Sequence, residues 1–280
     1  MKRKSIFFIA AILFFAVSES FSLSQTENDY IEKILSFRLS LRTCASADEA
    51  IEKIHEFESA EKGAMRALGE EARLVAENML RTAEYNCEYE KDVKSPALEP
   101  ILRPAFTKIT SYNAAHSEES LSAIYIISSA DVINSMMQFL PQSEAIRLGM
   151  QEKKSYAAVL EKNPAMTLAL IDSAFWYYFA PAVVGGSKKK AQVFFEDALK
   201  YASNDYEKFY AAIYLSQFHF EQKDEKSAKL YLSQAEKVLP GTRYIKFIEK
   251  INSLGFSLYD FNNNSSREKV NKKLAAQKNS

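Results

Sequence analysis

The chain has 280 residues, and its 36 basic side chains balance its 36 acidic ones, so its formal net charge at neutral pH is zero. A chain without excess positive charge has no broad electrostatic footprint for nucleic acid, which disfavours that class of partner. Seven glycines and seven prolines are few for this length, and a chain so poor in helix breakers is expected to be helical.

The N-terminus has the layout of a secretory signal peptide. Three basic residues at 2–4 precede an apolar run over 6–17, and a serine-rich stretch ends at Ser24. Because the apolar run is too short for a spanning helix, we expect residues 1–24 to be removed and the mature chain to be exported, to the periplasm or beyond. An uncleaved N-terminal anchor is the alternative. No other segment is apolar enough to span a membrane, so we expect no transmembrane segment in the mature chain.

Along the rest of the chain, apolar residues recur at three- and four-residue spacing, which indicates helices and not strands. Residues 25–140 are predicted to form an N-terminal helical region. In the region 141–258 the helix ends are clearer, and the predicted helices cover 142–161, 164–179, 187–202, 205–221, 225–239 and 242–254. The last residues are rich in Asn, Ser and Lys, so we expect a disordered basic tail over 259–280.

Two helix pairs in the second region share a pattern of small and large apolar residues. Ala191, Phe195 and Ala198 in one pair have the same spacing as Ala228, Leu232 and Ala235 in the next, which ends at Pro240. This pattern resembles the tetratricopeptide repeat (TPR), in which small residues let paired helices approach and large ones fill the groove between neighbours. The resemblance implies an all-α protein, an α-α superhelix or TPR-like solenoid of roughly ten helices.

The stretch from Phe175 to Ala198 is also similar to the exported, tetratricopeptide-type T components of TRAP transporters. It combines aromatic residues with Pro181, a Gly185-Gly186 pair and lysines, followed by the repeat residues. This similarity implies a helical body that partners a periplasmic substrate-binding protein. Members of that family are often lipoproteins, and the present chain departs from them because no cysteine closely follows its apolar run.

Aligning the two repeats predicts which side chains line the concave groove. They are Leu168, Ile171, Phe175, Tyr178 and Phe179 from one hairpin, and Tyr210, Ile213, Gln217 and Phe220 from the next. A groove this rich in aromatic residues suits a protein, an extended peptide or an apolar small molecule. Alternatively, the N-terminal helices fold over this face and bury it, because proteins rarely leave so large an apolar patch in water.

Two features near the groove have both a functional and a structural interpretation. The first is a possible anion-binding site at a predicted helix start, formed by Gly185, Gly186, Ser187 and Lys188. Backbone N–H groups and positive charge at a helix N-terminus attract anions. A turn with a solvated N-cap would also explain these residues. Asp172 lies among aromatic residues, where it could have a raised pKa, accept a hydrogen bond from a tyrosine or point to solvent.

The two cysteines and three histidines offer little reactive chemistry. Cys44 and Cys87 would fall at the same end of an up-down-up helix arrangement, so an exported chain could pair them in a disulfide; two buried free thiols are the alternative. The histidines lack metal-ligand spacing, and neither a cofactor fingerprint nor a nucleophile elbow is present. We therefore expect no metal, no cofactor and no catalysis.

These features predict an exported helical-repeat protein of the cell envelope that works by binding. The first hypothesis is a protein–protein interaction scaffold or transport accessory, for which the structure should show an open groove. The second is a carrier of an apolar small molecule, for which it should show an enclosed, aromatic-lined pocket or pore. A hydrolase is the remote alternative and would need a nucleophile hydrogen-bonded to a histidine.

Overall fold

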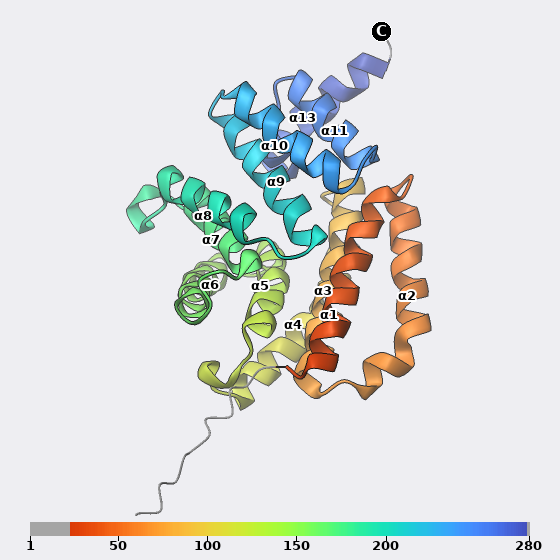
Figure 1. Cartoon of the computed structure of the whole chain (residues 1–280), viewed down its shortest axis with the longest axis vertical. Helices are drawn as coiled ribbons and strands as arrows, with labels where there is room; N and C mark the ends of the chain where they lie inside the picture. The colour runs from red at the N-terminus through yellow and green to blue at the C-terminus, as the bar shows by residue number, and fades with distance from the viewer. Residues whose placement is uncertain (1–22, 279–280) are drawn as a thin grey trace, which may run out of the picture.

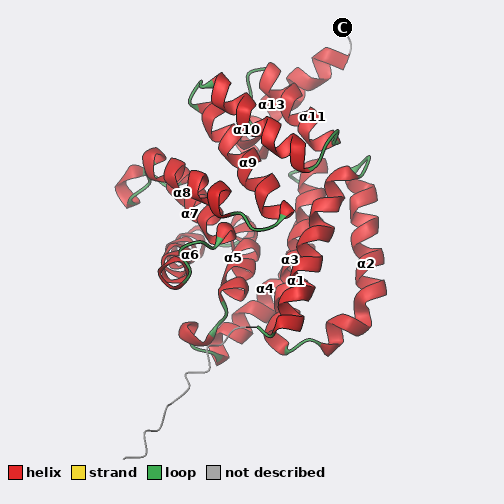
Figure 2. Cartoon of the chain, viewed as in Figure 1, coloured by secondary structure: helices red, strands yellow, loops and turns green. Residues whose placement is uncertain are grey.

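The computed structural model describes residues 23–278, and Figure 1 shows this part of the chain as a single helical body. The described residues form thirteen α-helices and four short 3-10 turns, with no strand (Figure 2). The predicted all-α, TPR-like superhelical fold is therefore confirmed, with thirteen helices where roughly ten were expected. Nearly all of the expected signal peptide, residues 1–24, lies outside the described residues, so it stays a prediction. Between residues 23 and 278, no helix is both long enough and apolar enough to cross a membrane.

The N-terminal region consists of five helices, which are α1 (Gln25–Ser40), α2 (Ala47–Ala67), α3 (Glu70–Lys91), α4 (Leu98–Ala115) and α5 (Ala123–Met136). Helix α3 is central and packs against the other four. A helix surrounded in this way buries polar as well as apolar side chains, and these need partners. The buried amide of Asn78 accordingly donates to the hydroxyl of Ser129 at 3.2 Å, which ties α3 to α5.

The repeat region follows as α6 (Gln142–Lys162), α7 (Thr167–Phe179), α8 (Lys188–Tyr201), α9 (Asp205–Glu221), α10 (Glu225–Val238) and α11 (Arg243–Ser253). Helices α7 and α8 pack as one hairpin, and α9 and α10 as the next. The small residues lie where the repeat pattern predicts them, because Ala191, Ala198 and Ala235 have no exposed surface and Ala228 is only 5% exposed. In the second hairpin, the hydroxyl of Ser216 donates to the carbonyl of Ala228 at 2.8 Å, so the two helices also share a hydrogen bond.

The predicted disordered tail is wrong, since α12 (Leu258–Asn262) and α13 (Asn264–Lys278) occupy this segment. Arg267 donates to the carbonyl of Phe261 at 2.8 Å and to the carbonyl of Glu90 at 2.6 Å, and its guanidinium lies 3.3 Å from the centre of the Phe261 ring. Val270 has no exposed surface. Two anchoring side chains in an otherwise polar segment are enough to dock the helix, and composition alone does not reveal them.

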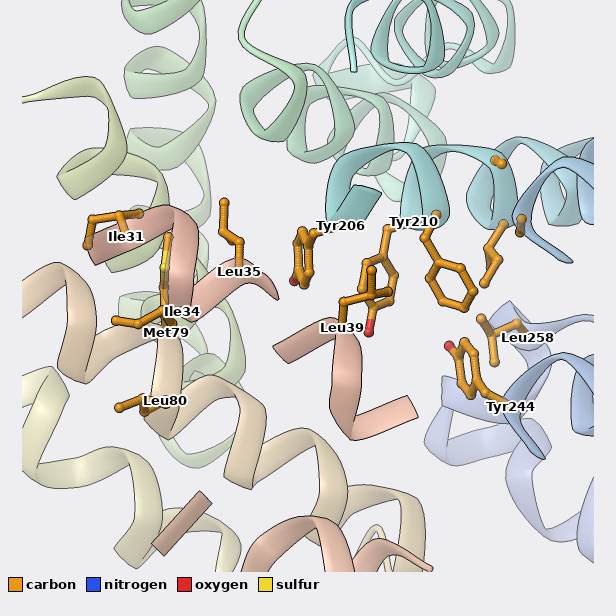
Figure 3. Packing of buried hydrophobic residues seen from close by; sticks show 14 of the residues in the cluster. Ile31, Ile34, Leu35, Leu39, Met79, Leu80, Tyr206, Tyr210, Tyr244 and Leu258 are labelled. Atoms are coloured by element: carbon orange, nitrogen blue, oxygen red, sulfur yellow. The ribbon is translucent and has the colours of Figure 1, made fainter. Parts of the chain in front are cut away.

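The N-terminal helices pack over the inner face of the repeat hairpins. Helix α1 contacts α9, and the 3-10 turn η1 (Leu41–Thr43) contacts α11. Figure 3 shows Tyr206 and Tyr210 of α9 near Leu35 and Leu39 of α1, within the largest buried cluster of the molecule's described part. The alternative expectation for the groove is therefore largely correct, because the N-terminal helices cover it. A cavity stays open beneath this cover.

Candidate functional site: a central charged cavity

A cavity of about 430 Å³ lies between the N-terminal helices and the repeat helices. Its wall includes side chains from α1, η1, α3 and α5 on the N-terminal side and from α7, α9 and α11 on the repeat side. Five predicted groove residues line it, namely Leu168, Ile171, Phe175, Phe179 and Tyr210. These five side chains therefore share one cavity, and the N-terminal helices form its other wall.

The other four predicted groove residues do not line this cavity. Tyr178 packs against Tyr259, with ring centres 5.2 Å apart, and Phe220 lines a separate pocket beside α10 and α11. Ile213 is fully buried in the core. The side-chain carbonyl oxygen of Gln217 accepts the Leu258 N–H at 2.8 Å. Tyr178 and Gln217 contact α12, an element whose position the repeat pattern does not specify.

Two arginines one helical turn apart, Arg38 and Arg42, face the cavity. The Nε of Arg42 donates to the hydroxyl of Tyr210 at 2.7 Å, and one of its terminal nitrogens lies 3.3 Å from a Glu90 oxygen, so Arg42 is paired. Arg38 is only 8% exposed, and its guanidinium lies 5.0 Å from the centre of the Tyr206 ring. No hydrogen bond or salt bridge joins the Arg38 side chain to another described residue.

Two carboxyl groups, from Asp131 on α5 and Asp172 on α7, also line the cavity. Burial raises the pKa of Asp131 to about 6, although the charge of Arg38 opposes the rise. Burial raises the pKa of Asp172 well above its ordinary value, and the nearby Asp131 and Glu152 carboxyls add to the effect. The Oδ2 of Asp172 is buried and has no hydrogen-bond partner among the described residues. The raised-pKa interpretation of Asp172 therefore agrees with its position, whereas acceptance from a tyrosine does not occur at this oxygen.

Four tyrosines form the part of the wall that contacts Arg38 and Arg42. Tyr206, Tyr210 and Tyr214 follow one another at four-residue spacing on α9, with ring centres 4.7 Å and then 5.8 Å apart, and Tyr244 joins them from α11. In the described part of the chain, the hydroxyls of Tyr206, Tyr214 and Tyr244 have no hydrogen-bond partner. The four-residue spacing of these tyrosines, and of Arg38 and Arg42, is visible in the sequence and was the available signal for this site.

The glycine-rich turn before α8 has a structural explanation. The N–H groups of Gly185, Gly186 and Ser187 all donate to carbonyl oxygens of the preceding segment, at 2.8 to 3.1 Å, so they are not free to bind an anion. Gly185 has φ 98°, and a side chain on Gly186 would place its Cβ 1.8 Å from a backbone oxygen, so both positions require glycine. The Nζ of Lys188 lies 5.3 Å from the Tyr178 ring centre, which gives this lysine a cation–π contact.

Cys44 and Cys87 lie in the same buried cluster, at one end of the N-terminal helices, and both are free thiols. Burial raises the pKa of Cys87 to about 11. Among residues 23–278, no group of three or more potential ligand side chains is arranged to hold a metal ion. His55 contacts Glu84 at 3.1 Å, His116 contacts the carbonyl of Tyr112 at 2.9 Å, and His219 contacts Asp224 at 3.2 Å.

No protein-family model matches the chain, and no curated protein matches it. Among solved structures, the chain is similar to a thermophilic TPR protein of Thermus thermophilus, with 12% sequence identity and a TM-score of 0.48. The match covers 80% of this chain and 98% of that one. A similarity at this level does not indicate a function for this chain.

Proposed function

We propose that this protein is a non-catalytic binding protein whose helical body encloses a small organic ligand in the central cavity. The unpaired guanidinium of Arg38 carries the proposal. Burying a charged group without a salt bridge or a hydrogen bond costs several kcal/mol. A buried arginine that faces a cavity and lacks a salt bridge is therefore better explained by a ligand than by stability.

The polar side chains of the cavity favour a different ligand from the apolar one of the second hypothesis. Aromatic side chains such as Phe175 and Tyr214 do form much of the wall. However, Arg38, Asp131 and Asp172 also face the cavity, so an entirely apolar molecule would leave these polar groups without hydrogen bonds. The ligand we propose is amphipathic, with an apolar body and at least one polar group.

The chain contains its own reporter for this proposal, because its one tryptophan, Trp176, lines the cavity. We would titrate the purified protein with a library of small organic molecules and follow Trp176 fluorescence with selective excitation. Ser135, a half-buried residue of the wall, offers a steric test. Ser135→Tyr should reduce the free volume of the cavity and weaken the binding of compounds that occupy it, whereas Ser135→Ala should bind them normally.

An unchanged response in Ser135→Tyr would place the binding outside the cavity and refute the proposal. A library without any binder would also count against it. Native mass spectrometry provides an independent readout, because the ligand-bound mass should make up a smaller fraction of Ser135→Tyr than of the wild-type protein or of Ser135→Ala.

A second candidate function, a protein-interaction scaffold or transport accessory in the cell envelope, is supported by exposed apolar side chains. Ile146 is 61% exposed and Met150 39% exposed on α6, and Val183 is 94% exposed in the nearby turn η4 (Ala182–Val184). The Nζ of Lys153 on α6 donates to the carbonyl of Val184 at 3.3 Å, which connects α6 to this turn. Exposed apolar surface of this kind is typical of protein contacts.

Export and a TRAP-type association belong to this second candidate, and they rest on the N-terminal sequence and on the similarity over Phe175–Ala198. Affinity capture from the cell envelope tests it: a periplasmic substrate-binding protein should be recovered with the wild type and lost with Val183→Asp. Leu230→Asp, at a 54% exposed position on the distant α10, is the matched control and should recover the same protein. Equal recovery with both variants would refute this candidate.

A further inference from the structure

The charges of the cavity point to the class of ligand. We infer that the ligand is a small organic monocarboxylate, with its carboxylate on Arg38 and its apolar body against the aromatic wall of α7 and α9. This inference rests on the proposed function and specifies the chemistry of the same site.

The first step is the assignment of charges to partners. Glu90 lies 3.3 Å from Arg42 and 3.5 Å from Arg243, so these three side chains form a network of their own. Arg38 has no such contact, and the carboxyl whose charge acts on it, Asp131, forms no salt bridge with it. One positive charge in the cavity wall therefore has no close counter-ion in the described structure.

The second step concerns geometry. A guanidinium is planar and presents parallel N–H groups that match the two oxygens of a carboxylate. The Tyr206 ring lies 5.0 Å from the Arg38 guanidinium carbon, and this contact restricts the orientation of the guanidinium before any ligand arrives. The free hydroxyls of Tyr206, Tyr214 and Tyr244 add hydrogen-bond donors to the same wall, so the site is rich in donors.

The third step separates a carboxylate from a phosphate. A phosphate monoester carries up to two negative charges, whereas Arg38 supplies a single unpaired positive one, and the Asp131 carboxyl faces the same space. A second negative charge on the ligand would be repelled by Asp131. A monocarboxylate matches the single available charge.

The fourth step concerns the body of the ligand. Phe175 packs edge-on against Tyr214, with ring centres 4.7 Å apart, and Leu168 and Ile171 line the cavity beside it. Such a wall favours a flat apolar group. The unpartnered Oδ2 of Asp172 provides one more hydrogen-bonding position, which would suit a hydroxyl substituent on the body.

The test uses three probes of similar size and different charge: phenylacetate, phenylacetamide and 2-phenylethylamine. Binding is followed by the fluorescence of Trp176, with native mass spectrometry as the second readout. The wild type should bind phenylacetate about tenfold more tightly than the amide, because the charge-assisted hydrogen bonds to Arg38 are lost in the amide. The amine should bind most weakly.

Variants assign this preference to Arg38. Arg38→Gln should weaken phenylacetate binding about tenfold and leave phenylacetamide binding within about twofold. Arg38→Lys, which keeps the charge but loses the planar fork, should give an intermediate affinity. Asp131→Asn should tighten phenylacetate binding, since it removes a repelling carboxylate. Arg66→Gln, at an exposed position on α2, is the control and should leave all three affinities unchanged.

Several results would overturn the inference and leave the proposed function standing. The first is equal affinity of the wild type for phenylacetate and phenylacetamide. The second is an equal loss of affinity for phenylacetate and phenylacetamide in Arg38→Gln, with a native circular dichroism spectrum. The third is a library in which only neutral or cationic molecules bind. Should Arg38→Gln fail to fold, the opposite shifts expected for Arg38→Lys and Asp131→Asn still decide the question. A protein that binds no compound of any kind would remove both proposals.

Discussion

The guanidinium carbon of Arg42 lies 4.0 Å from the centre of the Tyr244 ring. This cation–π contact joins the turn η1, which follows α1, to α11 of the repeat region. The same arginine donates to the hydroxyl of Tyr210 on α9 and pairs with Glu90 on α3. One residue thus joins α3, α9 and α11. All four side chains line the cavity, so this joint forms part of its wall.

Arg42→Ala should destabilise the protein by about 3 kcal/mol, because it removes the cation–π contact and leaves Glu90 without its closest partner. Chemical denaturation followed by circular dichroism measures this change in the free energy of unfolding. Arg66→Ala, on the exposed surface of α2, should change it by less than about 0.5 kcal/mol. Equal effects of the two substitutions would show that the joint contributes nothing to stability.

Glu152 should make the protein less stable as the pH rises. This side chain is 6% exposed, and burial raises its pKa from 4.5 to about 8, with Asp131 and Glu118 adding to the rise. Between these two values the folded state holds a proton that the unfolded state has released. The associated stability is therefore present below pH 4.5 and is lost as the pH approaches 8.

Glu152→Gln removes this titration, so it should reduce the pH dependence of unfolding and stabilise the protein at pH 8 by about 2 kcal/mol. Thermal or urea unfolding across this pH range provides the measurement. Glu161→Gln, at an exposed position on the same helix, should leave the slope unchanged. The assignment fails if the slope of Glu152→Gln equals that of the wild type.

Ala191→Trp should unfold the hairpin of α7 and α8, because Ala191 has no exposed surface and the two helices are in contact there. Overpacking by so large a side chain costs about 3 kcal/mol or more. Val193→Trp introduces the same side chain on the same helix at a position that is 51% exposed, and it should be tolerated. A melting temperature unchanged by Ala191→Trp would contradict the repeat assignment.

Val270→Asp should detach α13, because Val270 is fully buried and a carboxylate cannot be accommodated there without a partner. Hydrogen exchange over residues 264–278 should then become fast, while the repeat hairpins keep their protection. Lys269→Asp creates the same side chain one residue earlier, at an exposed position, and should leave the exchange slow. Fast exchange of this segment in the wild type would restore the sequence-based expectation of a disordered tail.

Cys87 should react slowly with alkylating reagents in the folded protein. Burial raises its pKa to about 11 and the residue is 7% exposed, so at pH 8 only about one thiol in a thousand is ionised. Labelling of the Cys44→Ser variant, analysed by mass spectrometry, isolates the Cys87 signal and should become fast on addition of denaturant. Rapid labelling of the folded variant would show that the thiol is accessible.

Local sequence determined the helices and the hairpins. The predicted helix over 205–221 coincides with α9, because its start depends on the Asn204 cap, whose side chain accepts the Glu207 N–H at 2.9 Å. Caps and periodic spacing depend on residues a few positions apart, so they can be recognised without knowledge of the fold. The small residues at Ala191 and Ala228 were recognisable for the same reason.

Only the tertiary structure decided what the helices enclose. In the sequence, Arg38 looks like an ordinary charge near the end of a helix, and nothing near it indicates that Tyr206, far along the chain, will lie against it. Val270 likewise lies in a polar segment of the sequence, but in the structure it is part of the core. The cavity depends on how the N-terminal helices dock on the repeat hairpins. That docking is the sum of many weak apolar contacts between distant segments, so no local pattern in the chain encodes it.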